Sequence, residues 1–159
     1  MATTKHSKYA LGNPPAPAPT AQEVVSVHTS VSLATTDIDL GDVIQMFKLP
    51  AGCIPVGYEV GRTDMDTGTP ALAASLGILN AAGDAISTAA VDGGAAWITN
   101  QAWGGTADLV LHTASKAAYD IMHAVQAVGY DRTVAFVITA AAATAASGTV
   151  ELGFSYKAA

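Results

Sequence analysis

The feature that most constrains the fold of this chain is an alternation of apolar and polar residues at a period of two. In its first occurrence, Val25, Val27, Val31 and Leu33 alternate with three serines and a histidine. Successive side chains of a β-strand point to opposite faces of a sheet, so the pattern predicts a strand with one buried face. A surface α-helix requires apolar residues three and four positions apart, and this segment does not have that spacing.

Five more segments alternate in the same way, and turn-forming residues separate them. Their apolar positions are Val43, Phe47 and Leu49; Ile54, Val56, Tyr58 and Val60; Leu72, Leu76 and Ile78; Val134, Phe136 and Ile138; and Val150, Leu152, Phe154 and Tyr156. Clusters of Gly, Pro, Asp and Asn interrupt the pattern at residues 37–42, 50–52, 64–70 and 80–84. We therefore expect an all-β fold, either a β-sandwich or a jelly-roll-like antiparallel domain. The last two alternating segments are expected to pair with each other, so that the final strand closes the fold.

The middle of the chain, residues 85–131, is harder to interpret. Residues 108–112 have the character of a short strand. Residues 114–128 carry apolar side chains at helical spacing, namely Ala118, Ile121, Met122, Val125 and Val128. Both a helix and a partly extended segment fit this pattern, so the expected fold contains at most one short helix.

Residues 1–21 differ in composition from the rest, and we interpret them as an extended N-terminal arm before a β-sandwich domain of residues 22–159. The arm is marked by three basic residues and four prolines: Lys5, His6, Lys8, Pro14, Pro15, Pro17 and Pro19. Alternating proline and alanine favour polyproline II and remove backbone donors, so the arm is not expected to join a sheet. A flexible terminus and an arm that orders on a neighbouring subunit both remain open, and the second makes these seven residues candidate partner-binding residues. The domain is expected to fold without the arm.

Composition limits both the core and the partners. Alanine supplies 33 of the 159 residues, so large apolar side chains are scarce, which favours a thin-layered architecture or burial against partner subunits. A net charge of −6 argues against nucleic acid as a partner. The first residues contain no apolar stretch of signal-peptide length. Residues 133–150 are uncharged, but their Thr, Ser and Gly content favours two strands and a loop over a membrane span.

No set of residues with catalytic spacing stands out, and we expect neither an enzyme nor a bound cofactor or metal. Cys53 is the single cysteine, which excludes an internal disulfide, and we interpret it as a small buried residue rather than a nucleophile. The four histidines, His6, His28, His112 and His123, are not paired at the spacing of zinc ligands. His28 and His112 are expected on exposed strand faces.

Two turns are rich in aspartate, with Asp37, Asp39 and Asp42 in the first and Asp64 and Asp66 in the second. Calcium prefers several such oxygens at close range, but no later glutamate completes a calcium loop. Aspartate also stabilises turns, because its side chain accepts hydrogen bonds from nearby backbone amides. We favour the turn interpretation over a bound cation.

Both tryptophans, Trp97 and Trp103, lie among small residues close to the glycine pairs at 93–94 and 104–105. The glycine pairs are interpreted as tight connections, since the Lys-Ser/Thr ending of a phosphate-binding loop is absent. A flat indole ring can serve as a platform for a carbohydrate or a protein partner, so both tryptophans join the candidate partner-binding residues. The favoured alternative is that they fill gaps left by the abundant alanine.

Two stretches of the chain resemble small structural proteins of tailed-bacteriophage virions, especially head decoration or cement proteins. The first is the sequence DVIQMFKLPAG at residues 42–52, followed by an alternating strand, by TDMDTGTPAL at residues 63–72 and by LGILN at residues 76–80. The second is the closing stretch GTVELGFSY at residues 148–156. The resemblance covers residues 42–80 and 133–157. Cys53 stands where alanine is more usual in that family.

This resemblance implies a β-sandwich or jelly-roll-like module that sits on the outer surface of a phage capsid, often as a homotrimer. The major capsid protein would be its partner, with no nucleic acid and no membrane involved. The implied function is to stabilise the shell by bridging capsid subunits. Two alternatives remain open: a neck, tail or fibre-associated virion module, and a carbohydrate- or receptor-binding β-sandwich that uses the tryptophans and the acidic turns.

Overall fold

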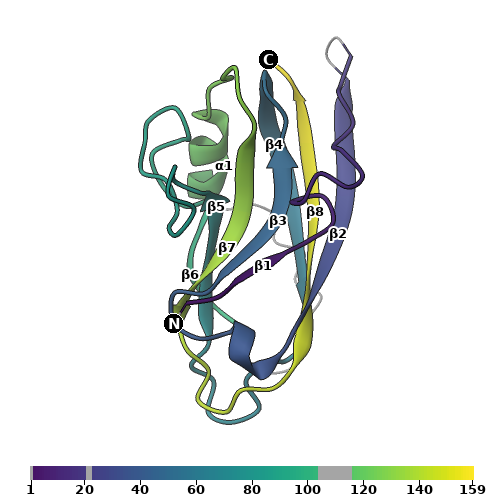
Figure 1. The fold of residues 1–159 in the computed structure, drawn as a ribbon. Coiled ribbons are helices and arrows are strands. Elements are labelled where there is room, and N and C mark those ends of the chain that lie inside the picture. The colour runs from purple at the N-terminus through teal and green to yellow at the C-terminus, as the bar shows by residue number, and fades with distance from the viewer. Residues whose placement is uncertain (1, 21–22, 104–115) are drawn as a thin grey trace.

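The computed structural model describes residues 2–20, 23–103 and 116–159, which form two β-sheets packed face to face (Figure 1). The five-stranded sheet has the order β1 (Thr4–His6), β3 (Val43–Leu49), β7 (Arg132–Ala140), β5 (Ala73–Ile78) and β6 (Ile98–Ala102). The three-stranded sheet has the order β2 (Val24–Leu33), β8 (Gly148–Ala158) and β4 (Cys53–Arg62). These strands pair antiparallel, apart from the parallel pair of β1 with β3. The prediction of an all-β sandwich is confirmed.

The core lies between the two sheets and uses the alternating positions that the sequence predicts. On β8, the side chains of Val150, Leu152, Phe154 and Tyr156 are all buried. The ring of Phe47 on β3 lies 5.1 Å from that of Phe154 and 5.2 Å from that of Tyr156, measured between ring centroids. Aromatic rings from facing sheets thus supply volume that an alanine-rich chain cannot supply with aliphatic residues.

A β-bulge in β4 changes which of its residues face the core. The pairing register with β8 shifts between Pro55 and Gly57. Ile54 and Val56 are half-buried, whereas Tyr58 is buried in the main core. The prediction that these three share one buried face is therefore wrong, because an extra residue in one strand reverses the face on which the following side chains lie.

A second bulge has the same effect in β3, where the register with β7 shifts between Gln45 and Phe47. Val43 contacts a smaller cluster with Leu79 and Ala135, whereas Phe47 lies in the main core. The prediction that Val43 shares a face with Phe47 is corrected by this shift. No glycine or proline, the residues that often mark a bulge, lies in β3, so the sequence gives no signal for this one.

The last two strands do not pair with each other, contrary to the prediction. β7 pairs with β3 and β5 in the five-stranded sheet, and β8 pairs with β2 and β4 in the other. The Ala/Thr-rich connection of residues 141–147 therefore crosses from one sheet to the other at the lower end of the sandwich in Figure 1. Each strand is central in its own sheet, with a neighbour on both sides.

The N-terminal segment lies against its own chain. Residues Thr4–His6 form β1, which pairs in parallel with Val43–Gln45 of β3, so the expectation that the arm stays out of any sheet is wrong for these three residues. The prolines lie after β1, where their missing N–H groups remove nothing from the ladder. Figure 1 shows the segment crossing the open side of the sandwich between β3 and β2. Independent folding of residues 22–159 stays a prediction.

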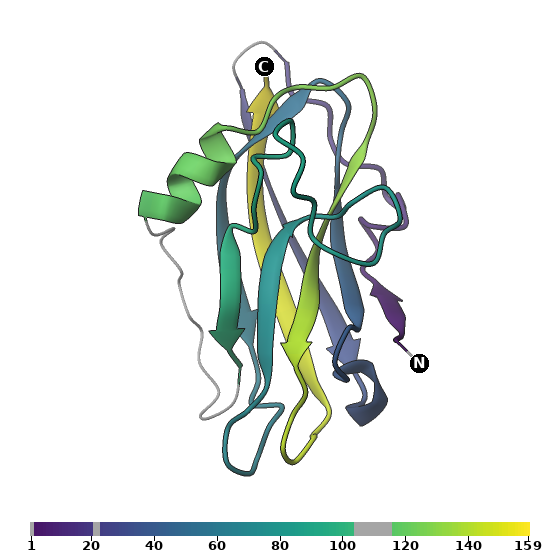
Figure 2. The same ribbon diagram turned by 90° about the vertical axis from the view of Figure 1, so that its left-hand side faces the viewer.

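One α-helix, α1 (Lys116–His123), and one 3-10 turn, η1 (Thr35–Asp37), complete the described elements. The helix falls within the helical pattern of residues 114–128, and Figure 2 shows it beside the upper end of the five-stranded sheet. The strand expected at residues 108–112, with His112, lies outside the described residues. None of the helices described is long and apolar enough to cross a membrane. Residues 133–150 instead form β7, a loop and the start of β8.

Candidate functional site

The basic residues of the N-terminal segment line a groove beside β2. Residues 5–8 form one wall and residues 28–32 of β2 form the other, around a hollow of about 420 Å³. The Nζ atom of Lys5 lies 3.1 Å from the buried carboxylate of Asp37, and Nδ1 of His6 lies 3.1 Å from Oε1 of Gln45. Lys8 is exposed, with its Nζ 5.3 Å from the centre of the Tyr9 ring. The structure thus brings the three predicted basic residues into one surface feature.

The segment after β1 is fixed to the core at several points. The Ser7 hydroxyl donates a hydrogen bond to the backbone oxygen of Met46, and the Tyr9 ring lies 6.0 Å from that of Phe47. Tyr156 donates its hydroxyl proton to the backbone oxygen of Pro17. Burial, together with the neighbouring Cys53 and Tyr9, raises the pKa of Tyr156 to about 12, so this donor keeps its proton at neutral pH.

The four predicted prolines lie at the surface of this segment. Pro14, Pro15 and Pro17 are exposed and Pro19 is half-buried. Their pyrrolidine rings are therefore accessible to a partner, although the backbone oxygen of Pro17 is already used within the chain.

The two tryptophans belong to the core. Trp97 is 3% exposed and stacks on Phe154 at 5.8 Å, and Trp103 is 2% exposed with an edge-on contact to Phe136 at 4.9 Å. Their placement corrects the hypothesis of an exposed platform, because neither ring presents a face to a ligand in the folded chain. The alternative interpretation, that they fill space left by small residues, agrees with these contacts.

The aspartates of the first acidic turn bind backbone donors. Asp37 accepts a hydrogen bond from the N–H of Ala34 at 2.8 Å, and Asp42 accepts one from the N–H of Asp39 at 2.8 Å and another from that of Thr3. The turn interpretation is confirmed for these two carboxylates. Asp42 also ties the N-terminal segment to the turn before β3.

Asp66 makes the densest set of contacts in the second turn. Its buried carboxylate accepts hydrogen bonds from the N–H groups of Ala71 at 2.8 Å, Leu72 at 3.0 Å, Ala143 at 3.1 Å and Thr144 at 2.8 Å. Burial alone would raise its pKa, but these four backbone donors outweigh burial and hold the pKa of the carboxyl well below its usual range. This charge joins the turn after β4 to the loop between β7 and β8.

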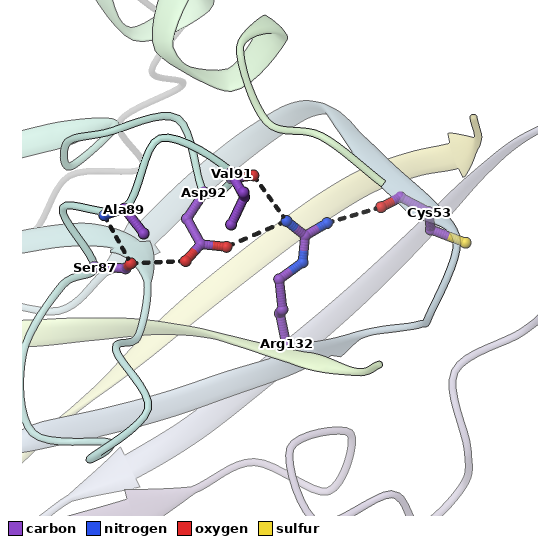
Figure 3. A network of polar contacts seen from close by, with 6 residues as sticks. All are labelled: Cys53, Ser87, Ala89, Val91, Asp92 and Arg132. Carbon is purple, nitrogen blue, oxygen red and sulfur yellow. Dashed lines mark hydrogen bonds and ion pairs between the residues drawn. The ribbon is translucent and has the colours of Figure 1, made fainter. Parts of the chain in front are cut away.

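A buried network that the sequence analysis missed lies at the other end of β7 (Figure 3). The Arg132 guanidinium contacts the Asp92 carboxylate at 3.2 Å, the backbone oxygen of Val91 at 3.2 Å and that of Cys53 at 3.0 Å. Ser87 donates its hydroxyl to the other oxygen of Asp92 at 2.7 Å. Since 40 residues separate Asp92 from Arg132, no local spacing in the sequence reveals the pair. The network joins the loop before β6 to β7 and to the start of β4.

The arrangement around Arg132 holds structure together and offers no reactive group. Both Asp92 oxygens are occupied, and a shallow hollow of about 680 Å³ adjoins the network at residues 79–92. Cys53 contributes its backbone oxygen, while its thiol is buried, as the sequence predicts. Burial raises the pKa of that thiol, and the nearby Arg132 charge offsets part of the rise. The thiol is therefore protonated and a poor nucleophile.

The remaining candidate ligands are dispersed. His28 is exposed on β2, as predicted, and its Nε2 lies 3.7 Å from a carboxylate oxygen of Glu151. The His123 ring lies 3.9 Å from that of Tyr119 on α1. Within the described parts of the chain, no three His, Cys, Asp or Glu side chains come together in a way that could hold a metal ion.

Known proteins share this fold. No family model matches the chain, and no curated protein matches its sequence. Among solved structures, it is similar to a chain of the "Capsid of Ralstonia phage GP4", with a TM-score of 0.74 and 24% identity over 98% of both chains. It is also similar to a chain of the "Cyanophage Pam1 capsid asymmetric unit", with a TM-score of 0.50 and 23% identity over 89% of this chain and 91% of that one. At these identities the likeness establishes a shared β-sandwich fold.

Proposed function

We propose that this protein is a structural component of a phage virion, a decoration or cement protein that binds the outside of the head. The observation that carries the proposal is the likeness of fold to a chain of the Ralstonia phage GP4 capsid, which extends over 98% of both chains. Because one fold hosts many functions, the likeness needs independent support. The resemblance of residues 42–80 and 133–157 to head decoration proteins gives that support from sequence.

The polar chemistry of the chain is consistent with a structural role. The carboxylates of Asp66 and Asp92 are fully engaged in holding loops, and the Cys53 thiol is buried and protonated. The proposal therefore includes neither catalysis nor a cofactor. It names the major capsid protein as partner, a homotrimer as the assembly, and the capsid surface as the location.

The proposed mechanism is mechanical. A protein that bridges capsid subunits binds the assembled shell and not its dissociated parts, so its binding free energy adds to the stability of the shell alone. Repeating a modest contact at many equivalent positions resists internal pressure without any single strong bond.

The N-terminal segment is part of this proposal. Lys8, Pro14, Pro15 and Pro17 are exposed on a segment that is already ordered along the sandwich. A contact made by an ordered segment costs little further conformational entropy. We assign these residues, together with Lys5, His6 and Pro19, to the surface that meets a neighbouring subunit.

The direct test mixes purified protein with head shells that lack it, taken from the phage whose genome encodes it. We expect saturable cosedimentation with intact shells, a higher melting temperature of the shells, and added density on their outer surface in cryo-electron microscopy. Shells of an unrelated phage serve as the control. Binding to tails or necks instead of heads, or no binding to any of these parts, contradicts the assignment to the head.

The assembly state is measured separately by light scattering. We expect a mass three times the 16.0 kDa of one chain. A variant that lacks residues 1–21 is expected to bind shells more weakly than the full chain. Its melting temperature must be measured in parallel, because Ser7 and Tyr9 contact the core and their loss also lowers stability.

A further inference from the structure

β2 forms one edge of the three-stranded sheet. β2 pairs with β8 on one side, and no described strand pairs with it on the other. In a strand that pairs on one side only, alternate residues direct their N–H and C=O groups away from the partner. Over the ten residues of β2 this leaves a long row of backbone groups that a further strand could bind.

Natural proteins often protect such an edge with proline, charged side chains or a bulge, and the sequence and pairing of β2 provide none of these three. Its sequence, VVSVHTSVSL, contains no proline, glycine, lysine or carboxylate. β4, the other edge of the same sheet, carries Pro55 and Gly57 around a bulge, and α1 packs beside it. An edge that lacks these features favours a partner that pairs with it.

The groove described above gives access to this edge. Residues 28–32 of β2 form one wall and residues 5–8 the other. Thr29 lies in the first wall, is 2% exposed, and has a hydroxyl with no hydrogen-bond partner among the described residues. Buried hydroxyls are normally paired, so the unpaired group points to a missing polar neighbour at this position.

The charge of the groove indicates what kind of chain fits. Its walls contain Lys5, His6, Lys8 and His28 and no carboxylate, in a protein whose net charge is −6. Asp37 already pairs with Lys5 and a carboxylate oxygen of Glu151 lies 3.7 Å from Nε2 of His28, which leaves Lys8 as the cation most free to meet an incoming acidic group. Exposed pairs of this kind contribute little affinity, so charge orients the partner while backbone pairing supplies most of the binding.

We propose that the β2 groove binds an extended acidic segment of a neighbouring shell subunit, which adds to β2 as a further strand. The identity of the donor as a shell subunit rests on the function proposed above. A second copy of this chain is the weaker candidate. Pairing β2 with β2 would bring two sets of basic groove residues together, and β2 has no carboxylate to balance them.

Hydrogen exchange read by mass spectrometry tests the backbone pairing directly. Free protein and protein saturated with head shells are labelled in parallel. We expect exchange in residues 24–33 to slow at least tenfold on shell binding, as edge amides gain partners. Residues 53–62 of β4 serve as the internal control and should change little. If the protein binds shells but residues 24–33 gain no protection, the proposal for the β2 groove is wrong and the proposed function stands. If the protein does not bind shells, the groove proposal and the proposed function are both wrong.

Two charge reversals test the acidic character of the partner. Lys8→Glu is expected to weaken shell binding about fivefold at low salt, and less as salt rises. Lys48→Glu is the matched control, because Lys48 is exposed on β3 outside the groove and should bind as the unchanged protein does. If the two variants lose the same shell affinity, or if neither loses any, the proposal that the partner segment is acidic is wrong. Protection of residues 24–33 that grows with protein concentration and needs no shell identifies a second copy as the occupant instead.

Discussion

Two buried carboxylates hold loops at opposite ends of β7, and they do so by different means. Asp66 accepts its hydrogen bonds from four backbone N–H groups, whereas Asp92 accepts one from a hydroxyl and pairs with the guanidinium of Arg132. Every residue except proline carries a backbone N–H, so the first site is indifferent to the side chains of its donors. The second site depends on one particular partner. Substitution of Asp66 is therefore expected to lose stability that no second substitution restores. Asp92 and Arg132, in contrast, can be substituted as a pair.

The largest effect is expected for Asp66→Ala. The substitution leaves four N–H groups without an acceptor in a buried site, and each unsatisfied buried group costs about 1–3 kcal/mol before local relaxation. We expect the free energy of unfolding to fall by about 3–5 kcal/mol after such relaxation. Urea denaturation followed by tryptophan fluorescence measures the change.

Asp39→Ala is the matched control, since Asp39 is exposed in the other acidic turn and donates its backbone N–H, which alanine retains. Its unfolding free energy should change by less than about 0.5 kcal/mol. Equal losses in the two variants would mean that the Asp66 contacts add nothing to stability.

The next effect concerns the ion pair. Arg132→Met leaves the Asp92 carboxylate buried with the Ser87 hydroxyl as its remaining side-chain partner, and we expect a loss of about 2–4 kcal/mol. Replacing both members, as Asp92→Leu with Arg132→Met, removes the unpaired charge. The double variant should be more stable than the sum of the two single losses predicts, because buried ion pairs can often be exchanged for apolar residues at little cost.

A double-mutant cycle measured by urea denaturation makes this test quantitative. A coupling of about 1 kcal/mol or more between the two positions supports the pair as the unit of stability. Strictly additive losses would show instead that each residue acts through its backbone contacts, such as that of the guanidinium with the backbone oxygen of Cys53.

Acid should distinguish the two sites further. The pKa of Asp66 is lower in the folded chain than its ordinary value of about 3.9, so its ionised form contributes stability that is fully present above that value. The contribution is lost as pH falls below about 4, at up to about 1.4 kcal/mol per pH unit for one group. Between pH 5 and pH 2.5, Asp66→Asn should lose stability less steeply than the unchanged protein, as measured by urea midpoints. If the stabilities of the two proteins fell equally with pH, the assignment of this pH dependence to Asp66 would be wrong.

The strand positions could be predicted from sequence because the signal is local. Val27, Val31 and Leu33 on β2 are buried by a single sheet face, and a period of two records that directly. The bulge in β3 could not be predicted, because one extra residue in a strand leaves an alternating pattern readable on either side of it. The bulge in β4 is marked by Pro55 and Gly57, a signal that the alternating pattern alone overlooks. The pairing of β7 with β3 rather than with β8 was also hidden, since a period of two does not say which strands are neighbours.

The contacts that position the polar sites join residues far apart in the chain. Asp66 was identified as a turn residue from Asp64 and Gly68 nearby, but two of its donors lie 77 and 78 residues away. Thr4–His6 is too short to show a period, and its place beside β3 depends on contacts such as that of Thr3 with Asp42. Sequence identified the basic character of Lys5 and Lys8, and the fold placed them beside β2.

The smallest effect is expected at Cys53, which separates a backbone contact from a side-chain contact within the Arg132 network. Cys53→Ala keeps the carbonyl that accepts the guanidinium N–H at 3.0 Å and removes one buried sulfur atom. We expect a loss of about 1 kcal/mol or less, far below that of Arg132→Met. In the unchanged protein the buried thiol should react with a disulfide reagent only after unfolding in urea, since burial raises its pKa and blocks access. Rapid reaction under native conditions, or a stability loss equal to that of Arg132→Met, would show that the thiol rather than the carbonyl is the functional part of this residue.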